Sequence, residues 1–228
     1  MKIEIPESFT ITAHAGSLGT KANSYDSIKA CLDFIGDSGC IEVDVRFNKR
    51  GVPVLCHNAS EANASPVTLA ELFALLKNCR TRVNLDMKRH SHMPEVQRLA
   101  EEYGVLPQLF FTGVKLRKAR TVKKGAPLIP YYINRDFYGI KRPAKRLKRL
   151  AERIKRAGGI GLNTTHTNVD EKMLEIMREN GLLVSVFTVD KEAGMRRALY
   201  LGVDNITTRR PDALRELMAE SNCDADNA

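Results

Sequence analysis

The sequence of 228 residues lacks the features of membrane-spanning and disulfide-rich proteins. No stretch approaches the roughly 20 consecutive apolar residues that cross a bilayer as a helix. The five cysteines are an odd number without a Cys-x-x-Cys pair, which favours reduced thiols over disulfides or a zinc site. The opening residues, MKIEIPESF, carry charges where a secretory segment needs an apolar run. We therefore expect a soluble, cytoplasmic protein.

A glycine-rich phosphate loop is absent as well. The first strand-like run, 9–14, leads into AHAGSLG and not into Gly-x-Gly-x-x-Gly. An open, doubly wound sheet that binds a dinucleotide needs that loop after its first strand, so this alternative fold is disfavoured. There is also no short-period repeat, low-complexity tract or linker, and we predict a single domain over 1–228.

Basic residues outnumber acidic ones, and the formal net charge is +9. This balance favours anionic ligands or surfaces without defining the fold. Much of the excess lies in 141–156, where Leu147, Leu150 and Ile154 form one apolar stripe. We interpret this run as an outer helix with a solvated cationic face, and contact with an anionic membrane surface as a second use of it. No aromatic residue interleaves with these basic ones, so we expect no nucleic-acid partner.

Short β-type runs alternate with amphipathic helical runs along the chain. The expected strands are 9–14, 40–47, 82–88, 108–112, 127–134, 160–164, 182–189 and 203–207, with a short companion of the second strand at 52–57. The expected helices are 25–34, 68–76, 94–103, 116–124, 143–157, 170–180, 192–201 and a last one from 211. Thr68 and Glu71 predict a capping box for the second helix. We predict an α/β fold, a (β/α)8 TIM barrel with a very short insertion after the second strand and a frayed polar end at 221–228.

Side chains that can carry chemistry gather at the ends of the first three predicted strands. In a barrel, these ends meet at one mouth, where active sites form. The second strand places alternate polar residues on one face because strand side chains repeat every two residues. The candidates are His14, Glu42, Asp44, Arg46, His57, Asp86 and Lys88.

The candidate set suits phosphoryl chemistry. Three converging carboxylates would repel one another unless a divalent cation with oxygen ligands neutralised them. Two histidines beside them can act as general acid and base, because imidazole titrates near neutral pH. A structural network in which Glu42 and Asp44 pair with Arg46 and Lys88 is the competing interpretation.

Several short motifs occur in a family-like order along nearly the whole chain. They are His14-Ala15-Gly16, Ala22-Asn23-Ser24, Glu42-Val43-Asp44-Val45, Pro53-Val54 with His57-Asn58, Asp86-Met87-Lys88, Phe187-Thr188-Val189, and Gly202-Val203-Asp204 with Ile206, Thr208 and Pro211. In this combination they resemble the glycerophosphodiester phosphodiesterase family, whose members are (β/α)8 barrels.

The resemblance implies a role for most of the candidates. It makes His14 and His57 the acid–base pair and Glu42, Asp44 and Asp86 the ligands of Mg²⁺ or Ca²⁺. Lys88 would contact the phosphate, and we count Lys88 and Arg46 as substrate-binding. The implied reaction is hydrolysis of a glycerophosphodiester, or a related small phosphodiester, to a phosphomonoester and an alcohol, within lipid metabolism.

Some positions depart from the family pattern. Ala15 stands for an arginine, Ala22 for a glutamate, Asn58 for an aspartate, and Asp86 for a glutamate that is one methylene longer. Two alternatives therefore stay open, namely a barrel that only binds a phosphorylated ligand and a phospholipase-type enzyme at a membrane surface. The released alcohol, the metal and the oligomeric state are left undetermined by the sequence.

Overall fold

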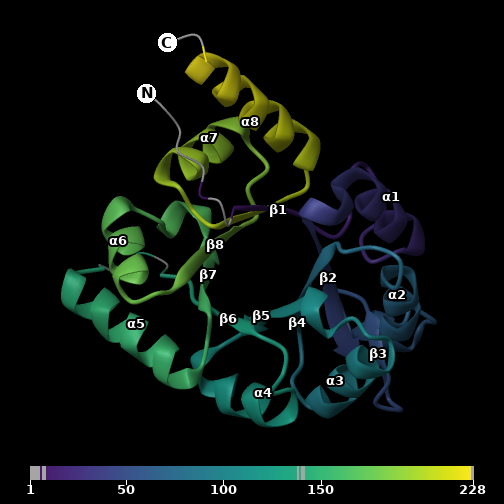
Figure 1. Ribbon diagram of the computed structural model, residues 1–228. Coiled ribbons are helices and arrows are strands. Elements are labelled where there is room, and N and C mark those ends of the chain that lie inside the picture. Colours follow the sequence, from purple (N-terminus) through teal and green to yellow (C-terminus); the bar gives the residue numbers. More distant parts are fainter. Residues whose placement is uncertain (1–5, 7–8, 138, 140–141, 227–228) are drawn as a thin grey trace.

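The eight expected strands are present and close into a parallel barrel (Figure 1). The computed structural model describes residues 6, 9–137, 139 and 142–226. The barrel strands are β1 (Thr10–Ala13), β2 (Cys40–Phe47), β4 (Arg82–Met87), β5 (Leu109–Val114), β6 (Tyr131–Asn134), β7 (Gly161–Thr165), β8 (Leu183–Phe187) and β9 (Asn205–Thr208). Neighbours pair in the order β1-β9-β8-β7-β6-β5-β4-β2, and a parallel pairing of β1 with β2 closes the ring. The TIM-barrel prediction is confirmed.

Helices surround the barrel and follow the predicted positions closely (Figure 1). They are α1 (Tyr25–Ile35), α2 (Leu69–Leu76), α3 (Met93–Glu102), α4 (Ala119–Gly125), α5 (Ala144–Ala157), α6 (Glu171–Glu179), α7 (Glu192–Leu201) and α8 (Pro211–Asp226). The capping box of Thr68 and Glu71 is formed, which satisfies backbone donors at the start of α2. The helix expected over 116–124 is divided into a 3₁₀ turn, Leu116–Lys118, and α4.

The second strand pairs with an antiparallel companion besides its parallel neighbours. Strand β3 (Pro53–Leu55) folds back on β2, with Val45 opposite Leu55. A short segment with one 3₁₀ turn, Ala59–Asn63, then leads to α2, so the insertion is as short as predicted. This hairpin returns the chain from the end of β2 to the level of Asp44, whose carbonyl oxygen accepts the backbone N–H of Cys56, and His57 follows.

The two faces of β2 bury different chemistry. Ile41, Val43 and Val45 belong to the large apolar cluster between the strands and the helices. Cys40, Glu42 and Asp44 alternate with them and therefore face the barrel interior. At the start of the strands this interior is filled by Cys40 with Phe110 and Tyr132, whose rings lie 5.7 Å apart. Glu42 and Asp44 thus lie between this apolar cluster and the C-terminal mouth of the barrel.

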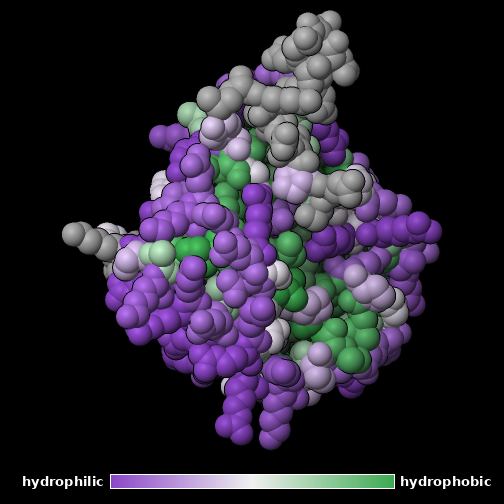
Figure 2. All heavy atoms as spheres, turned by 60° about the vertical axis from the view of Figure 1, so that its left-hand side comes forward, coloured by the Kyte–Doolittle hydropathy of each residue, from purple (hydrophilic) through white to green (hydrophobic). Residues whose placement is uncertain are grey.

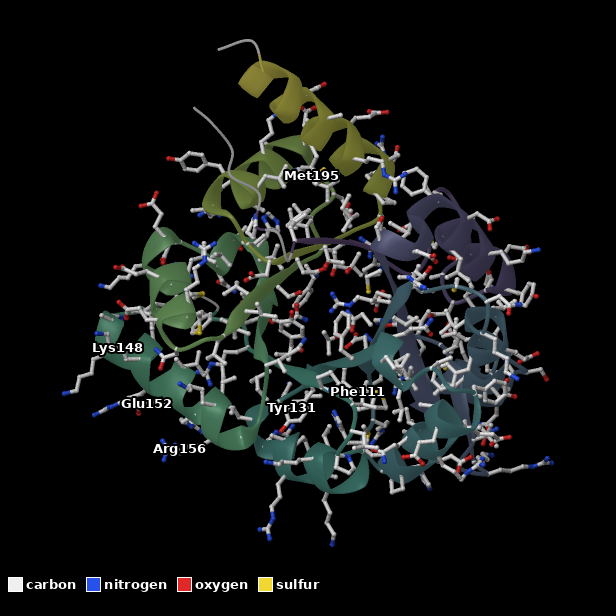
Figure 3. The ribbon with its side chains drawn as sticks, viewed as in Figure 1. Phe111, Tyr131, Lys148, Glu152, Arg156 and Met195 are labelled. Carbon is white, nitrogen blue, oxygen red and sulfur yellow. The ribbon has the colours of Figure 1, made fainter. Side chains whose placement is uncertain are left out.

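Helix α5 has the two faces expected of the basic run. Its apolar stripe, Leu147, Leu150, Ala151 and Ile154, is buried. Lys148, Glu152 and Arg156 point away from the barrel (Figure 3). Hydrophilic side chains cover most of the side of the molecule to which α5 belongs (Figure 2).

The stretch predicted to fray, 221–228, is helical as far as Asp226, and residues 227–228 lie outside the described part. Among the described helices, none combines the length and the apolar character needed to cross a membrane.

Candidate active site

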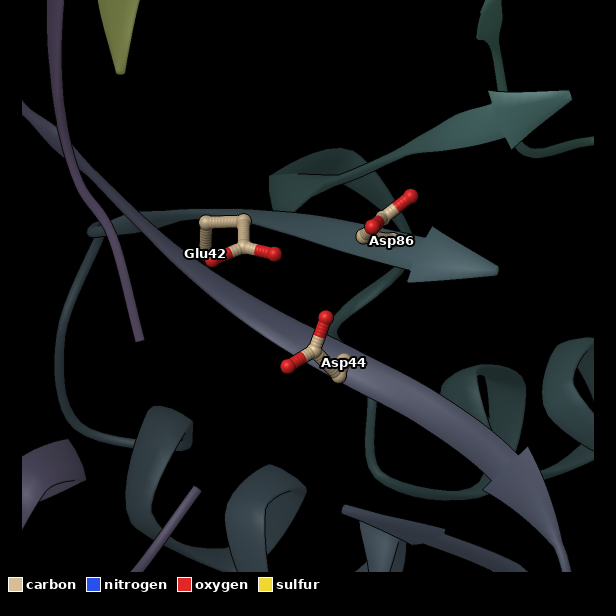
Figure 4. A group of neighbouring side chains, drawn as sticks. All are labelled: Glu42, Asp44 and Asp86. Atoms are coloured by element: carbon tan, nitrogen blue, oxygen red, sulfur yellow. The ribbon is translucent and has the colours of Figure 1, made fainter. Parts of the chain in front are cut away.

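Three carboxylates converge at the C-terminal mouth of the barrel (Figure 4). Glu42 and Asp44 lie on β2 and Asp86 on β4, where the parallel register places Asp44 beside Asp86. One oxygen from each lies within 4.8 Å of the other two. The predicted meeting of these side chains is therefore confirmed, while their role as metal ligands stays a prediction.

Glu42 is a buried carboxyl group whose charged form is disfavoured by its surroundings. It is 5% exposed, and its Oε2 accepts the backbone N–H of Ala15 at 2.9 Å. Burial, followed by the charges of Asp44 and Asp86, raises the pKa of Glu42 well above its usual range. Without a bound metal ion, the raised pKa of Glu42 therefore disfavours its charged form.

Lys88 links the other two carboxylates. Its Nζ lies 2.7 Å from Asp44 Oδ1 and also contacts Asp86 Oδ2. Burial alone would raise the pKa of Asp44, but Lys88, Asn23 and His57 together outweigh burial and lower that pKa. Burial opposes the charge on Lys88 as well, yet Asp86 and Asp44 raise its pKa above the usual value. Lys88 is thus held as a cation within the cluster.

His14 follows β1, and its side chain lies beside the carboxylate of Glu42. Its Nδ1 lies 2.7 Å from the carbonyl oxygen of Ala15 and 3.8 Å from Glu42 Oε2. Burial lowers the pKa of His14, so the neutral ring is favoured. A carbonyl oxygen can only accept a hydrogen bond, so we assign the proton of the neutral ring to Nδ1. Nε2 then keeps its lone pair.

His57 lies on the other side of Asp44 and is more open. Its side chain is 65% exposed, and its Nδ1 is 3.3 Å from Asp44 Oδ2. Arg46 Nε donates to the carbonyl oxygen of His57 at 2.7 Å. No ion pair joins Arg46 to the three carboxylates among the described residues, and Arg46 lines a separate hollow of about 300 Å³. Its contacts position His57, and direct substrate binding by Arg46 stays a prediction.

Sequence reasoning passed over residues that orient the carboxylates. Asn23 donates to Asp44 Oδ2 at 2.8 Å and accepts the backbone N–H of Asp44 at 2.9 Å. Thr112 Oγ1 lies 3.3 Å from Asp86 Oδ1 and 2.8 Å from Asn84 Oδ1. Asn23 stands in one of the quoted motifs, so its position was visible, but its hydrogen bonds depend on a backbone φ of 61° that the motif does not show.

Comparison with known proteins gives a family match. The model of the glycerophosphoryl diester phosphodiesterase family matches residues 79–213. This range includes Asp86 and Lys88 but begins after His14, Glu42, Asp44 and His57. A glycerophosphodiester phosphodiesterase of Arabidopsis thaliana is 24% identical over 220 residues, which covers 79% of this chain. The chain spans 65% of the length of that relative.

Solved structures with the same fold carry related names. A chain from Galdieria sulphuraria assigned to the glycerophosphodiester phosphodiesterases has a TM-score of 0.78 at 19% identity, covering 96% of this chain and all of its own, 100%. A phosphodiesterase from Oleispira antarctica in complex with the product sn-glycerol-3-phosphate has a TM-score of 0.73 at 18% identity, covering 94% and 97%. At such identities the likeness extends to the barrel fold.

Proposed function

The chain belongs to the glycerophosphoryl diester phosphodiesterase family, whose model matches more than half of its length, and from this premise we propose that it hydrolyses a glycerophosphodiester or a related small phosphodiester. The products are a phosphomonoester and an alcohol. The observation that carries the proposal is the convergence of three carboxylates, a lysine and two histidines at one barrel mouth. Such a set can neutralise a phosphate and move protons around it.

The carboxylate cluster fits a hard divalent cation. Carboxylate oxygens are the ligands that Mg²⁺ and Ca²⁺ prefer. Burial, followed by the charges of Asp44 and Asp86, raises the pKa of Glu42, and a bound cation would offset the repulsion among the three carboxylates. Glu42, Asp44 and Asp86 would hold the ion, which supplies charge stabilisation for the phosphoryl oxygens when bound. Lys88, already between Asp44 and Asp86, adds a donor for a non-bridging phosphate oxygen.

The two histidines take opposite proton-transfer roles in this proposal. His14 Nε2, with its lone pair, accepts the proton of the attacking oxygen, while Nδ1 stays fixed on the Ala15 carbonyl. His57 donates a proton to the oxygen of the leaving alcohol. Asp44 Oδ2, 3.3 Å from His57 Nδ1, orients the ring for this transfer. One proton is taken and one is given, so the pair ends each hydrolysis with its charges exchanged and is reset through solvent.

Ala15 stands where the family motif has an arginine, and its backbone still contacts two groups of the site. Ala15 donates its N–H to Glu42 and accepts from His14, and its own side chain is 5% exposed. A residue with these backbone contacts orders both the carboxylate and the base. The guanidinium missing here removes a phosphate contact without disturbing those two groups.

The compartment is also a proposal. The described cysteines, Cys31, Cys40, Cys56 and Cys79, are free thiols. Unpaired, widely spaced cysteines are typical of a reducing compartment, which supports the cytoplasm.

Turnover with and without a chelator tests the proposed function. We expect the protein to release a phosphomonoester from a glycerophosphodiester, to stop when the divalent cation is chelated, and to resume when Mg²⁺ or Ca²⁺ is added in excess. Full turnover in excess chelator would contradict the metal role. Binding of phosphate esters without any turnover would favour the binding-protein alternative.

A further inference from the structure

A cavity of about 620 Å³ opens beside Asp86 and Lys88. It lies over the C-terminal ends of β4, β5 and β6, and Arg153 of α5 reaches into its lining. This volume is in the range of sites for small organic ligands. Because the cavity shares Asp86 and Lys88 with the active site, a substrate whose phosphate lies at the carboxylates can extend into it.

The lining of this cavity is strongly cationic. Lys115, Arg117, Arg135 and Arg153 contribute positive charges beyond that of Lys88. Among the described residues, no ion pair joins any of these four to a carboxylate. The group therefore produces a positive potential that a bound anion would relieve.

The single acidic group that lines this cavity besides Asp86, within the described part of the chain, is Asp136. Its Oδ1 already accepts from the backbone N–H of Thr165 at 3.1 Å and from the Thr165 hydroxyl at 2.6 Å. Asp136 is thus turned to a neighbouring strand end. One carboxylate in this position leaves most of the positive charge of the cavity uncompensated.

Arg135 gives an independent sign of a missing partner. Its Nε is buried without a hydrogen-bond partner among the described residues, and its guanidinium lies 5.7 Å from the ring centre of Phe137. Burying a charged donor without an acceptor is unfavourable. A planar guanidinium held against an aromatic ring presents its N–H groups in the fork that phosphate oxygens match.

We propose that this cavity binds a second anionic group of the substrate, so that the protein acts on phosphodiesters in which one alcohol itself carries a phosphate. The inference rests on the proposed hydrolysis and names its substrate class. The diester phosphate carries one negative charge, which the carboxylate-bound cation and Lys88 meet. The four further cations are sufficient to neutralise the double charge of a phosphomonoester placed beyond the scissile bond.

A neighbouring hollow extends the cationic surface outward. It has a volume of about 470 Å³, shares Arg135 and Arg153 with the first cavity and adds Lys145 and Arg149 of α5. Aligned positive side chains of this kind steer an anionic substrate toward the mouth. The same chemistry could be met by a free diester or by the phosphorylated head group of a lipid.

The test uses two substrates that differ by one phosphate. They are glycerophosphoglycerol and the same diester with a phosphomonoester on its terminal hydroxyl. At physiological salt, we expect a kcat/KM at least about tenfold higher for the phosphorylated diester, because charge-assisted hydrogen bonds to phosphate contribute that much or more. The double variant Arg135→Gln with Arg153→Gln should bring the ratio close to one.

A matched variant controls for charge alone. Lys148→Gln with Arg156→Gln removes the same charge from the outward face of α5 and should keep the wild-type ratio (Figure 3). Equal kcat/KM values of the wild type for the two diesters would overturn the inference and leave the proposed function standing. A preference that survives the Arg135/Arg153 double variant would overturn the cavity as its cause.

Binding separates this inference from the failure of hydrolysis. Calorimetric titration of the His14→Ala variant with both diesters should give at least about tenfold tighter binding of the phosphorylated one. If no diester is hydrolysed, the proposed function fails, but tighter binding of the phosphorylated diester would still identify the ligand of the cavity. Equal affinities for the two diesters would reject the inference. The last experiment uses phosphatidylcholine vesicles that contain a lipid with the phosphorylated head group. Faster cleavage of this lipid than of the free phosphorylated diester would identify a lipid as the substrate.

Discussion

At the scale of single residues, burial favours the uncharged forms of two neighbours. Burial and the carboxylates around Glu42 raise its pKa, which favours the protonated acid, and burial lowers the pKa of His14, which favours the neutral ring. Their functions require opposite changes, since a metal ligand must be deprotonated and a base must gain a proton. A cation at the cluster would supply the charge that makes both changes favourable.

The binding of the divalent cation is therefore expected to depend on pH. A cation must displace the proton of Glu42, whose pKa is raised, so affinity should increase as pH rises and level off above that pKa. The Kd for Mg²⁺ or Ca²⁺, measured calorimetrically from about pH 5 to about pH 8, checks this. In Glu42→Gln this proton is absent and the increase should be smaller. A wild-type affinity that is constant over the range would show that Glu42 does not bind the ion.

Replacement of either histidine should remove most of the activity. Positioned acid–base groups typically contribute a factor of about a hundred to ten thousand, so His14→Ala and His57→Ala should each lower kcat at least about a hundredfold. The melting temperature should change little, because His57 is exposed and His14 is at the mouth of the barrel. His92→Ala, in an exposed loop, is the matched control and should keep wild-type kcat. Near-normal turnover of both mouth variants would make these histidines structural.

At the scale of elements, the site depends on the register of β2 and β4 and on an irregularity in β5. Register is shifted between Phe111 and Val114 of β5, and Gly113 has φ 75° there. A Cβ on Gly113 would lie 2.5 Å from Asp86 Oδ1 and 2.6 Å from the carbonyl oxygen of Met87. Glycine thus permits both the left-handed backbone and the close approach of the Asp86 carboxylate.

Gly113→Ala should weaken metal binding as well as lower the stability of the protein. The left-handed backbone alone costs an alanine about 1–2 kcal/mol, and the Cβ contact additionally displaces Asp86. Gly104→Ala is the matched control, because Gly104 has φ 71° with open space around its Cβ position. We expect similar losses of stability from backbone strain in both, with a weaker Kd for Mg²⁺ or Ca²⁺ in Gly113→Ala alone. Equal Kd values would show that Gly113 does not position Asp86.

Much of the fold and part of the site could be predicted from the sequence. Strands and helices follow local patterns, so β2 was located by alternation and α2 by the Thr68–Glu71 capping box. The carboxylates could be predicted to meet because parallel strands end at one mouth. The hydrogen bond of Asn23 to Asp44 and that of Arg46 to His57 could not be predicted, since both depend on loop backbone geometry. The cationic cavity joins residues after β5 and β6 to Arg153 of α5, and no local pattern records that proximity.

At the scale of the whole molecule, charge and chemistry are arranged around one mouth. The acidic cluster and its lysine lie at the ends of β2 and β4, the histidines flank it, and the cationic cavity opens next to it over β5 and β6. The net charge of +9 thus includes a group of cations at the place where an anionic substrate would bind. In a (β/α)8 barrel the C-terminal mouth carries the active site, while layers of side chains fill the interior as a packed core.

The central claim, hydrolysis of a phosphodiester at this mouth, is tested most directly by phosphorus NMR of the reaction. A glycerophosphodiester is incubated with the wild-type protein and Mg²⁺ or Ca²⁺, with His14→Ala in parallel. We predict that the wild type replaces the diester signal by a monoester signal, recognisable because its shift titrates near pH 6, where a monoester has its second pKa. His14→Ala should leave the diester signal nearly unchanged over the same time. A diester signal that persists with the wild type in both metals, across the phosphodiesters described above, would contradict the account.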